Sequence, residues 1–362
     1  MRELLAEFRA WQAAGVAVGR AVVVRTFGSA PRPAGASLVA TADGRIAGSV
    51  SGGCVEGAVV AEIARARADG LSRVLRYGIT DEQAWDVGLA CGGTIDVLVE
   101  PLVRPEIAEA AAGRGGSAVV IPLPSDAPRD EPGPRAPGAG EPPSPALVVD
   151  ADGTLRGSTG APGADAAIAA AARAALDRGG ATVVEAVGRQ WLVEGFAPPP
   201  RLVIVGAVQV AIPLARIARE IGYATVVVDG RAAFATRERF PDVDALVVGW
   251  LDEVADEIGL GPSDAVAVLA HDAKLDEPAI IEALRRGCRY VGAVGSRRTQ
   301  ADRRARLRTA GVGEPDLVRL RGPIGLDLGG RSPAETALAI IAEVVAERSG
   351  GSGAPLATLA GR

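Results

Sequence analysis

From residue 201 onward, short apolar runs alternate with helix-like stretches, and this alternation constrains the fold more than any other feature of the sequence. The apolar runs are RLVIVGA, ATVVVDG, ALVVGW, AVAVLAHD and YVGAVGS, and helical patterns follow over AIPLARIAREIG, 276–286, the Arg-rich stretch 295–308 and 333–347. Repeated βα units indicate a parallel sheet covered by helices. We therefore predict an α/β protein whose residues 201–347 form a Rossmann-like, doubly wound parallel sheet.

The N-terminal part of the chain has a different pattern. An amphipathic helix is expected over 2–13, followed by the apolar strand VAVGRAVVVRTFG and a hairpin that turns at Asp43-Gly44. A helical pattern begins at Cys54 and ends at Gly70, and GGTIDVLVEP indicates another buried strand. These elements predict an α+β domain over 1–103.

Between these regions, residues 104–200 indicate a small, β-rich middle unit. Its strand-like runs SAVVIPL and ALVVDADGTLRG flank a segment rich in Pro, Gly and Ser, residues 122–145. Such a segment buries too little apolar surface to order itself, so we expect a disordered insertion. The Gly-rich residues 348–362 are expected to form a flexible tail.

Composition excludes several classes of protein. The 362 residues are 48% hydrophobic with a net charge of −5, which gives no reason to expect nucleic acid or an anionic membrane as partner. No run reaches the length of a bilayer span, and charges interrupt the first twenty residues, unlike a signal peptide. We expect a cytoplasmic protein whose three cysteines are reduced thiols.

Two of the cysteines lie beside paired glycines, in Gly52-Gly53-Cys54 and Cys91-Gly92-Gly93. A thiol at a helix N-terminus is activated, and bare backbone lets an anionic ligand approach, so both segments are candidates for one binding pocket. The alternative is that these cysteines are ordinary buried residues, which is the interpretation that we favour for Cys288. Spacing typical of a zinc site does not occur.

The first βα turn of the C-terminal domain only partly matches a dinucleotide-binding motif. The window runs from Gly206 to Ala211, with Asp229 at the end of the second strand. The first glycine and the acidic residue are present, but Val208 fills the position that must be bare for a pyrophosphate to approach. The alternatives are a weak nucleotide site at Gly206 and Asp229, or a Rossmann domain that serves as a scaffold.

Other strand ends carry candidate polar groups. His271-Asp272 follows an apolar strand and is an acid/base candidate, with a structural histidine as the alternative. Arg297 and Arg298 are candidates for binding a phosphate or carboxylate, whereas most arginines of 295–308 are expected on a solvated helix face. Arg331 lies in a Gly-rich loop before a helix with capping-box spacing, another candidate anion site.

Taken together, these stretches resemble the XdhC/CoxI family. The N-terminal resemblance lies in GSAPRPAGASLV, DGRIAGSVSGGCVEG and GLACGGTIDVLVEP, and the C-terminal one in HDAKLDEPAI, YVGAVGSRRT and PIGLDLGGRSPAETALAIIAE. The family usually has a second glycine in the strand-one turn, where this chain has Val208.

The resemblance implies an accessory factor for molybdenum cofactor maturation rather than a turnover enzyme. Such a factor binds molybdopterin, assists its sulfuration by a cysteine desulfurase, and delivers it to the large subunit of a xanthine dehydrogenase or CO dehydrogenase-type hydroxylase. On this hypothesis Cys54 and Cys91 lie near the metal or the transferred sulfur, and the chain forms a homodimer. The alternatives are an NAD(P)-dependent oxidoreductase that uses Asp229 and His271-Asp272, and a C-terminal domain that is only a dimer scaffold.

Overall fold

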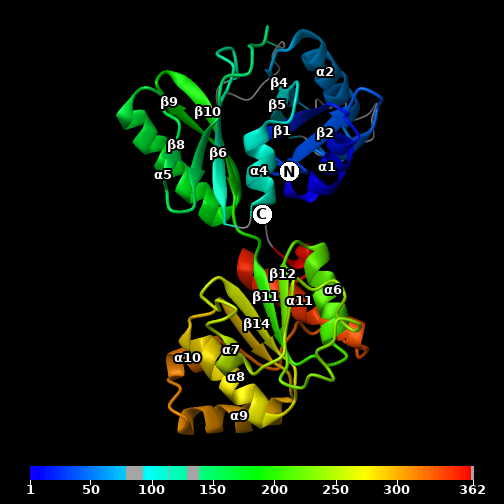
Figure 1. Cartoon of the computed structure of the whole chain (residues 1–362), viewed down its shortest axis with the longest axis vertical. Helices are drawn as coiled ribbons and strands as arrows, with labels where there is room; N and C mark the ends of the chain where they lie inside the picture. The colour runs from blue at the N-terminus through cyan, green and yellow to red at the C-terminus, as the bar shows by residue number, and fades with distance from the viewer. Residues whose placement is uncertain (79–92, 114, 129–137, 360–362) are drawn as a thin grey trace. The chain divides into compact units, whose positions relative to one another are not determined.

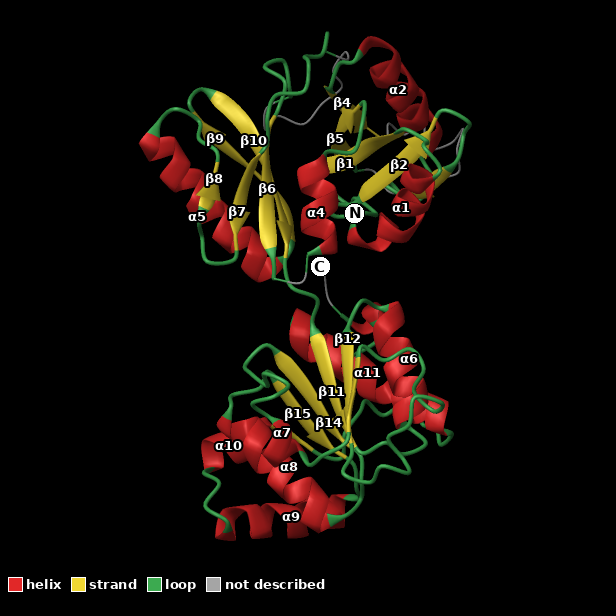
Figure 2. Cartoon of the chain, in the orientation of Figure 1, coloured by secondary structure: helices red, strands yellow, loops and turns green. Residues whose placement is uncertain are grey.

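The computed structural model describes residues 1–78, 93–113, 115–128 and 138–359. It contains two compact units, Met1–Pro198 and Pro199–Arg362. Figure 1 traces the chain through both units, and Figure 2 marks their helices and strands. Each unit is described by itself below.

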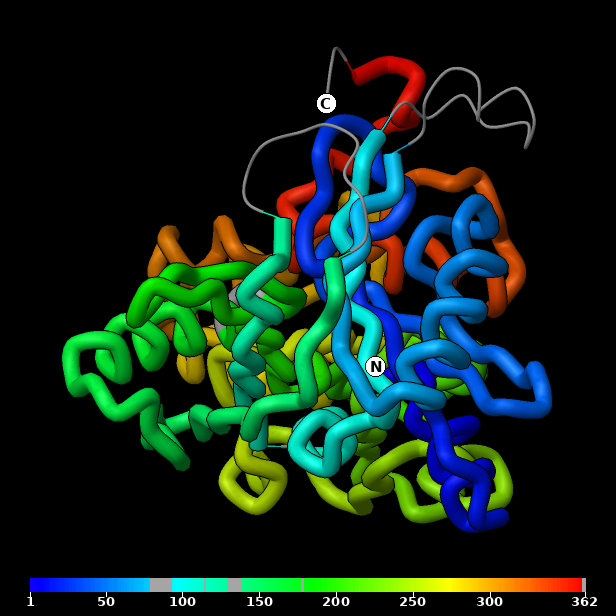
Figure 3. Tube along the Cα trace, turned by 90° about the horizontal axis from the view of Figure 1, so that it is seen from above, coloured from blue at the N-terminus to red at the C-terminus, as the bar shows by residue number. Residues whose placement is uncertain are grey.

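The first sheet of the N-terminal unit has the strand order β3-β2-β1-β5-β4, and all of its pairings are antiparallel. Strands β1 and β5 are far apart in sequence, but their blue and cyan traces run side by side in Figure 3. Gly44 has a φ of +85° in the turn between β2 and β3, which confirms the predicted hairpin at Asp43-Gly44. The strands are β1 (Val18–Phe27), β2 (Ser37–Thr41), β3 (Ile46–Gly48), β4 (Arg73–Gly78) and β5 (Thr94–Glu100).

The second sheet has the order β8-β7-β6-β10-β9 and is also antiparallel. Its strands are β6 (Ser117–Pro122), β7 (Leu147–Asp150), β8 (Leu155–Arg156), β9 (Gly180–Ala186) and β10 (Arg189–Phe196). The helices of this unit are the 3₁₀ turn η1 (Arg2–Leu4) and the helices α1 (Leu5–Ala13), α2 (Glu56–Asp69), α4 (Pro105–Ala112) and α5 (Pro162–Arg178).

Three hydrophobic clusters order the N-terminal unit into layers. Val59 and Ile63 of α2 pack against one face of the first sheet, and Ile168 of α5 packs against the outer face of the second. The remaining faces of the two sheets share a core that includes Phe8 of α1 and Ile107 of α4. Both faces of β1 are buried from Val18 to Val24, which explains why this stretch is apolar on both faces apart from Arg20.

A buried ion cluster joins the two sheets. Arg20 of β1 is 0% exposed and donates to Oε1 of Glu194 in β10 at 2.9 Å and to Oε2 of Glu100 in β5 at 3.4 Å. Burial alone would lower the pKa of Arg20, but the two carboxylates outweigh it and raise that pKa. The arginine is therefore charged and links β1 and β5 of the first sheet to β10 of the second.

The C-terminal unit contains one parallel sheet with the order β13-β12-β11-β14-β15-β16. Numbered from the first strand of the unit, this is the order 3-2-1-4-5-6 of a dinucleotide-binding fold. The strands are β11 (Arg201–Val205), β12 (Ala224–Val228), β13 (Ala245–Val247), β14 (Asp264–Val268), β15 (Tyr290–Ala293) and β16 (Leu320–Arg321).

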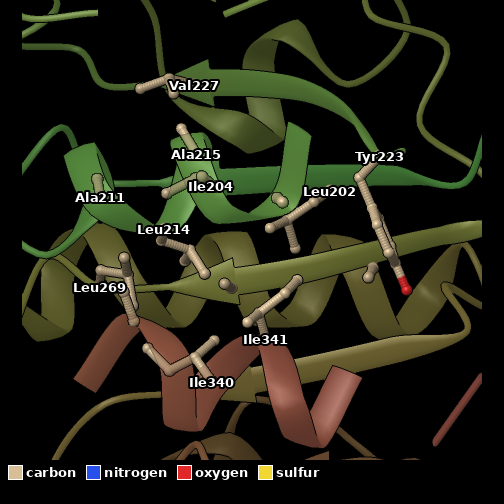
Figure 4. Packing of buried hydrophobic residues seen from close by; sticks show 14 of the residues in the cluster. Leu202, Ile204, Ala211, Leu214, Ala215, Tyr223, Val227, Leu269, Ile340 and Ile341 are labelled. Carbon is tan, nitrogen blue, oxygen red and sulfur yellow. The ribbon is translucent and has the colours of Figure 1, made fainter. Parts of the chain in front are cut away.

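Helices cover both faces of this sheet. Leu214 of α6 and Ile340 and Ile341 of α11 pack on one face, where Figure 4 shows them meeting Leu202 and Ile204 of β11. The opposite face packs against α7, α8, α9 and α10. The helices are α6 (Ala211–Glu220), α7 (Leu251–Val254), α8 (Ala273–Arg285), α9 (Arg297–Thr309), α10 (Glu314–Arg319), α11 (Pro333–Ser349) and the 3₁₀ turn η2 (Leu356–Thr358).

The predicted fold class is confirmed, with antiparallel sheets in the N-terminal half and a Rossmann-like parallel sheet after residue 201. The ends of the Pro-rich segment 122–145 are described by the structure, whereas its centre, residues 129–137, lies outside the described residues. Leu123 is 0% exposed, and Glu141 accepts from the Ser125 N–H at 2.8 Å and from Arg189 at 2.7 Å. The described ends of this segment are thus packed, because polar contacts with β10 compensate for its low apolar content.

Candidate functional site

The first candidate site is the loop between β3 and α2, which carries Gly52, Gly53 and Cys54. Gly52 and Gly53 have φ values of +80° and +121°, which L side chains rarely adopt, so the turn needs glycine. Both glycines are exposed, and a Cβ at Gly53 would meet nothing within 4 Å. Open space therefore lies directly beside this backbone, as the sequence pattern predicts.

The carboxylate of Glu56 lies at the centre of this loop. It accepts from the N–H groups of Val50, Ser51 and Gly53 at 3.2, 2.9 and 2.9 Å, and from the hydroxyls of Ser49 and Ser51 at 2.6 and 2.5 Å. Burial would raise the pKa of Glu56, but these donors outweigh it and lower that pKa to about 2. Sequence reasoning missed Glu56, although serines shortly before a glutamate at a helix start are a recognisable capping pattern.

Cys54 is half-buried and precedes the helix instead of opening it. The helix α2 begins at Glu56, two residues beyond the predicted start, because the chain at Ser51–Val55 is held in a turn. The Cys54 N–H donates to Ser51 Oγ at 3.0 Å, and its thiol lies 3.5 Å from the Ser51 carbonyl. The amide of Gly52 donates to Ser49 Oγ at 2.8 Å. These backbone donors are therefore satisfied within the chain and are not open to an external anion.

Two of the glycine motifs converge on the loop 28–35. A Cβ at Gly93 would lie 2.6 Å from the Ser29 carbonyl oxygen, and the atom nearest to a Cβ at Gly52 would be Cβ of Pro31, at 3.8 Å. Gly93 therefore permits a close approach of two backbones at the edge of the first sheet. Cys91 and Gly92 lie outside the described residues, so their place in a shared pocket stays a prediction.

The nucleotide-like residues of the C-terminal unit are already engaged. Gly206 has a φ of +101°, and a Cβ there would lie 2.9 Å from the Ala270 nitrogen. Asp229 is 3% exposed, accepts from the Ala207 N–H at 2.8 Å and pairs with Arg231 at 2.7 Å. Burial opposes ionisation, but these hydrogen bonds lower the pKa of Asp229. Val208 packs against the core. A ribose hydroxyl would have to compete with Arg231 for this carboxylate.

His271 lies three residues beyond the end of β14 and is exposed. Its φ of +62° is in the left-handed region, which is sparsely populated for residues other than glycine. Asp272 caps α8 by accepting from the Lys274 N–H at 3.0 Å, and no hydrogen bond joins it to His271 within the described chain. Sequence reasoning missed Asp276, a buried carboxylate in the first turn of α8, whose pKa is raised by burial although Arg303 lowers it. An acid/base role for His271 and Asp272 stays a prediction.

Most arginines of α9 are exposed, as expected, but Arg303 is buried and Arg304 half-buried. Arg303 is buried against Asp276 at 2.9 Å, and Arg304 donates to the Leu320 carbonyl at 2.7 Å. Arg306 pairs with Glu277, and Arg308 pairs with Glu314. These partners of Arg303, Arg304 and Arg306 are 16 or more positions away in the sequence, so a local pattern cannot show them.

Arg297 and Arg298, in contrast, are exposed at the start of α9 and have no acidic partner in the part of the chain that the structure describes. Arg331 is likewise exposed, before the capping box of Ser332 and Glu335. These three residues remain candidates for anion binding. The described residues contain no cluster of His, Cys, Asp and Glu suited to a metal ion, and none of their helices is long and apolar enough to cross a bilayer.

Comparison with known proteins identifies relatives for both units. Residues 202–344 match the family model described as the XdhC Rossmann domain, and residues 11–78 match that of the XdhC and CoxI family. The chain is 27% identical to a probable xanthine dehydrogenase subunit of Bacillus subtilis (strain 168), over 91% of this chain and 92% of that protein. It is also 27% identical to the molybdenum cofactor insertion chaperone PaoD of Escherichia coli (strain K12), over 90% and 82% respectively.

A solved structure has the same fold over nearly the whole chain. The crystal structure described as a xanthine dehydrogenase from Bacillus halodurans superimposes with a TM-score of 0.74 and 22% identity, covering 98% of each chain. At this level of identity the likeness supports the fold alone.

Proposed function

Because the chain belongs to the XdhC and CoxI family, we propose that it is a chaperone that binds molybdenum cofactor as cargo. The observation that carries the proposal is the alignment of 90% of this chain with a molybdenum cofactor insertion chaperone. In this proposal the protein assists sulfuration of the cofactor and its insertion into a xanthine dehydrogenase or CO dehydrogenase-type hydroxylase. Its partners are a cysteine desulfurase and the large subunit of that hydroxylase, in the cytoplasm, and the protein is a homodimer.

The loop between β3 and α2 fits one part of such a cargo. In this proposal the free, half-buried thiol of Cys54 lies near the metal or the transferred sulfur of the cargo. Gly53 is exposed, and nothing lies within 4 Å of the position that its Cβ would take, so the backbone there is accessible. Since Glu56 and the two serines already take the loop amides, the loop offers the cargo a thiol and no free amide donors for an anion. Within the C-terminal unit, we propose Arg297, Arg298 and Arg331 separately as anion-binding residues.

The direct test is anaerobic incubation of the protein with isolated molybdenum cofactor, followed by gel filtration and measurement of cofactor absorbance and molybdenum per chain. We expect stoichiometric retention by the wild-type protein and loss of retention in Cys54→Ser and Gly53→Val. The matched control is Cys288→Ser, because Cys288 is 0% exposed and burial raises the pKa of its thiol to about 11. Failure of the wild-type protein to retain cofactor would refute the proposal.

The alternative function is an NAD(P)-dependent oxidoreductase, and the strand order of the C-terminal sheet is what favours it. The engagement of Asp229 with Arg231 and the packing of Val208 both disfavour it. A nucleotide that binds only the folded state must raise the melting temperature, by the equivalent of about 2.7 kcal/mol at 100 times Kd. We expect millimolar NAD⁺ or NADP⁺ to give no shift, and a clear shift would favour the oxidoreductase.

A further inference from the structure

The loop that carries Cys54 is organised around one carboxylate, and this suggests a role for that carboxylate beyond helix capping. We propose that Glu56 is the positioning residue of the site, holding the Gly52–Gly53 turn so that Cys54 is presented in one conformation. This inference rests on the proposed function, since Cys54 contacts the cargo only in that proposal.

The hydrogen bonds form a continuous path from Glu56 to the cysteine. Glu56 Oε2 accepts from Ser51 Oγ at 2.5 Å, and Ser51 Oγ in turn accepts from the N–H groups of Cys54 and Val55, each at 3.0 Å. Glu56 Oε1 accepts from Ser49 Oγ, which holds the Gly52 amide. Removal of the carboxylate would therefore release both serines, and with them the backbone on either side of the glycine pair.

A comparison within the chain separates this role from ordinary capping. At α11, Glu335 is at the third helical position and uses Oε2 for the amides of Arg331 and Ser332 and for the Ser332 hydroxyl. Glu56 is the first residue of α2 and uses both oxygens for donors spread over residues 49–53, which lie before the helix cap at Val55. Glu335 closes a helix end, whereas Glu56 folds a loop whose glycines have left-handed backbone conformations.

The same arrangement excludes a second role for the loop. Three amides and two hydroxyls converge on Glu56 as they would on a bound phosphate. A phosphate would have to displace a carboxylate that is tethered within a few residues of every donor. The loop therefore presents a thiol and does not bind an anion.

The test measures the chemical reactivity of Cys54 separately from cofactor binding. Wild-type protein, Glu56→Gln, Glu56→Asp and Ser51→Ala are alkylated with iodoacetamide at pH 8, and modification of each cysteine is followed by peptide mass. Glu335→Gln is the matched control, because it weakens a comparable ring of hydrogen bonds in the other unit. Cys288, which is 0% exposed, reports whether the native fold persists during the reaction. Retention of isolated molybdenum cofactor is measured on the same samples.

We expect Glu56→Gln and Ser51→Ala to raise the alkylation rate of Cys54 by about tenfold, the factor expected for loss of one charge-assisted hydrogen bond, and to lower cofactor retention. Glu56→Asp should partly restore both properties, and Glu335→Gln should change neither. If Cys54 is alkylated in Glu56→Gln at the same rate as in the wild-type protein, the inference is overturned. If the wild-type protein retains no cofactor but Glu56→Gln still raises alkylation, the proposed function fails and the positioning role stands.

Discussion

The buried ion pair between Asp276 and Arg303 gives the sharpest stability prediction. Asp276 is in the first turn of α8 and is 0% exposed, and Arg303 of α9 is 3% exposed. Arg303 donates to Asp276 Oδ2, the Val294 carbonyl and Gln300 Oε1, each at 2.9 Å. These bonds join α9 to the first turn of α8 and to the loop that follows β15.

We predict that Arg303→Met destabilises the C-terminal unit by about 4 kcal/mol at pH 7, because it leaves a buried carboxylate without its cation. The buried carboxylate can instead bind a proton, and the free energy of protonation at pH 7 is about 4 kcal/mol for an acid with an unfolded pKa of about 4. For a unit of the size of Pro199–Arg362, a loss of 1 kcal/mol lowers Tm by roughly 2–4 °C, so the expected shift is roughly 8–16 °C.

The pH dependence follows from the same reasoning. Burial raises the pKa of Asp276 even though Arg303 and His271 lower it, and loss of Arg303 raises it further. A folded-state pKa above the unfolded value means that the folded state binds the extra proton, so stability falls as pH rises. The free energy needed to protonate the carboxyl falls by about 1.4 kcal/mol for each pH unit. The destabilisation caused by Arg303→Met should therefore fall to about 1.5 kcal/mol at pH 5.

Differential scanning calorimetry of the full chain at pH 7 and pH 5 tests this prediction, with Arg306→Met as the matched control. Arg306 is on the same helix, but its side chain is 48% exposed where it pairs with Glu277, so its loss should cost less than about 1 kcal/mol. The double variant Arg303→Met/Asp276→Asn should be more stable than Arg303→Met at pH 7. Equal costs for Arg303→Met and Arg306→Met, or no relief from Asp276→Asn, would refute the reasoning.

Three further predictions concern the candidate sites. The double variant Arg297→Ala/Arg298→Ala should weaken binding of inorganic phosphate, measured calorimetrically, and should lower stability by less than about 0.5 kcal/mol. The charge-matched variant Arg306→Ala/Arg308→Ala should not weaken phosphate binding, because these arginines pair with Glu277 and Glu314. Gly93→Ala should lower Tm, since its Cβ would lie 2.6 Å from the Ser29 oxygen, whereas Gly57→Ala in α2 has open space and should stabilise the helix by about 0.5–1 kcal/mol. The lowered pKa of Glu56 contributes stability that is present above its unfolded pKa and is lost as pH falls toward about 2. This contribution is about 1–2 kcal/mol after screening by solvent. The free energies of unfolding of Glu56→Gln and wild type, measured in urea, should therefore converge between pH 4.5 and 2.

The sequence predicted those features whose causes are local. Alternation of apolar strands and helices sufficed for the parallel sheet, Asp43-Gly44 for a hairpin turn, and Ser332 with Glu335 for a capping box, which the structure confirms. Each of these depends on residues a few positions apart. The resemblance drawn from the motifs is likewise confirmed by the family models that match both units.

The sequence could not predict which charged groups find partners through the fold. Arg303 and Asp276 are 27 residues apart, and the pattern of α9 gives no indication that this arginine is buried and Arg297 is not. Glu56 is a different case, because its partners lie only three to seven residues away and the serines before it formed a pattern that was overlooked. Apolar periodicity predicts which face of a helix is buried, but it does not predict which groups a carboxylate side chain contacts.

Two of the sites where glycine-rich sequence suggested anion binding are filled by a carboxylate of the chain itself. Glu56 takes the amides around Gly52 and Gly53, and Asp229 takes the amide that follows Gly206. In both places a free anion would have to displace a carboxylate side chain that the protein itself holds beside these amides. The proposed contribution of Arg297 and Arg298 to anion binding should weaken as ionic strength rises, because both side chains are exposed. The contribution of the Cys54 thiol should not, so the salt dependence of cofactor retention distinguishes the two kinds of contact.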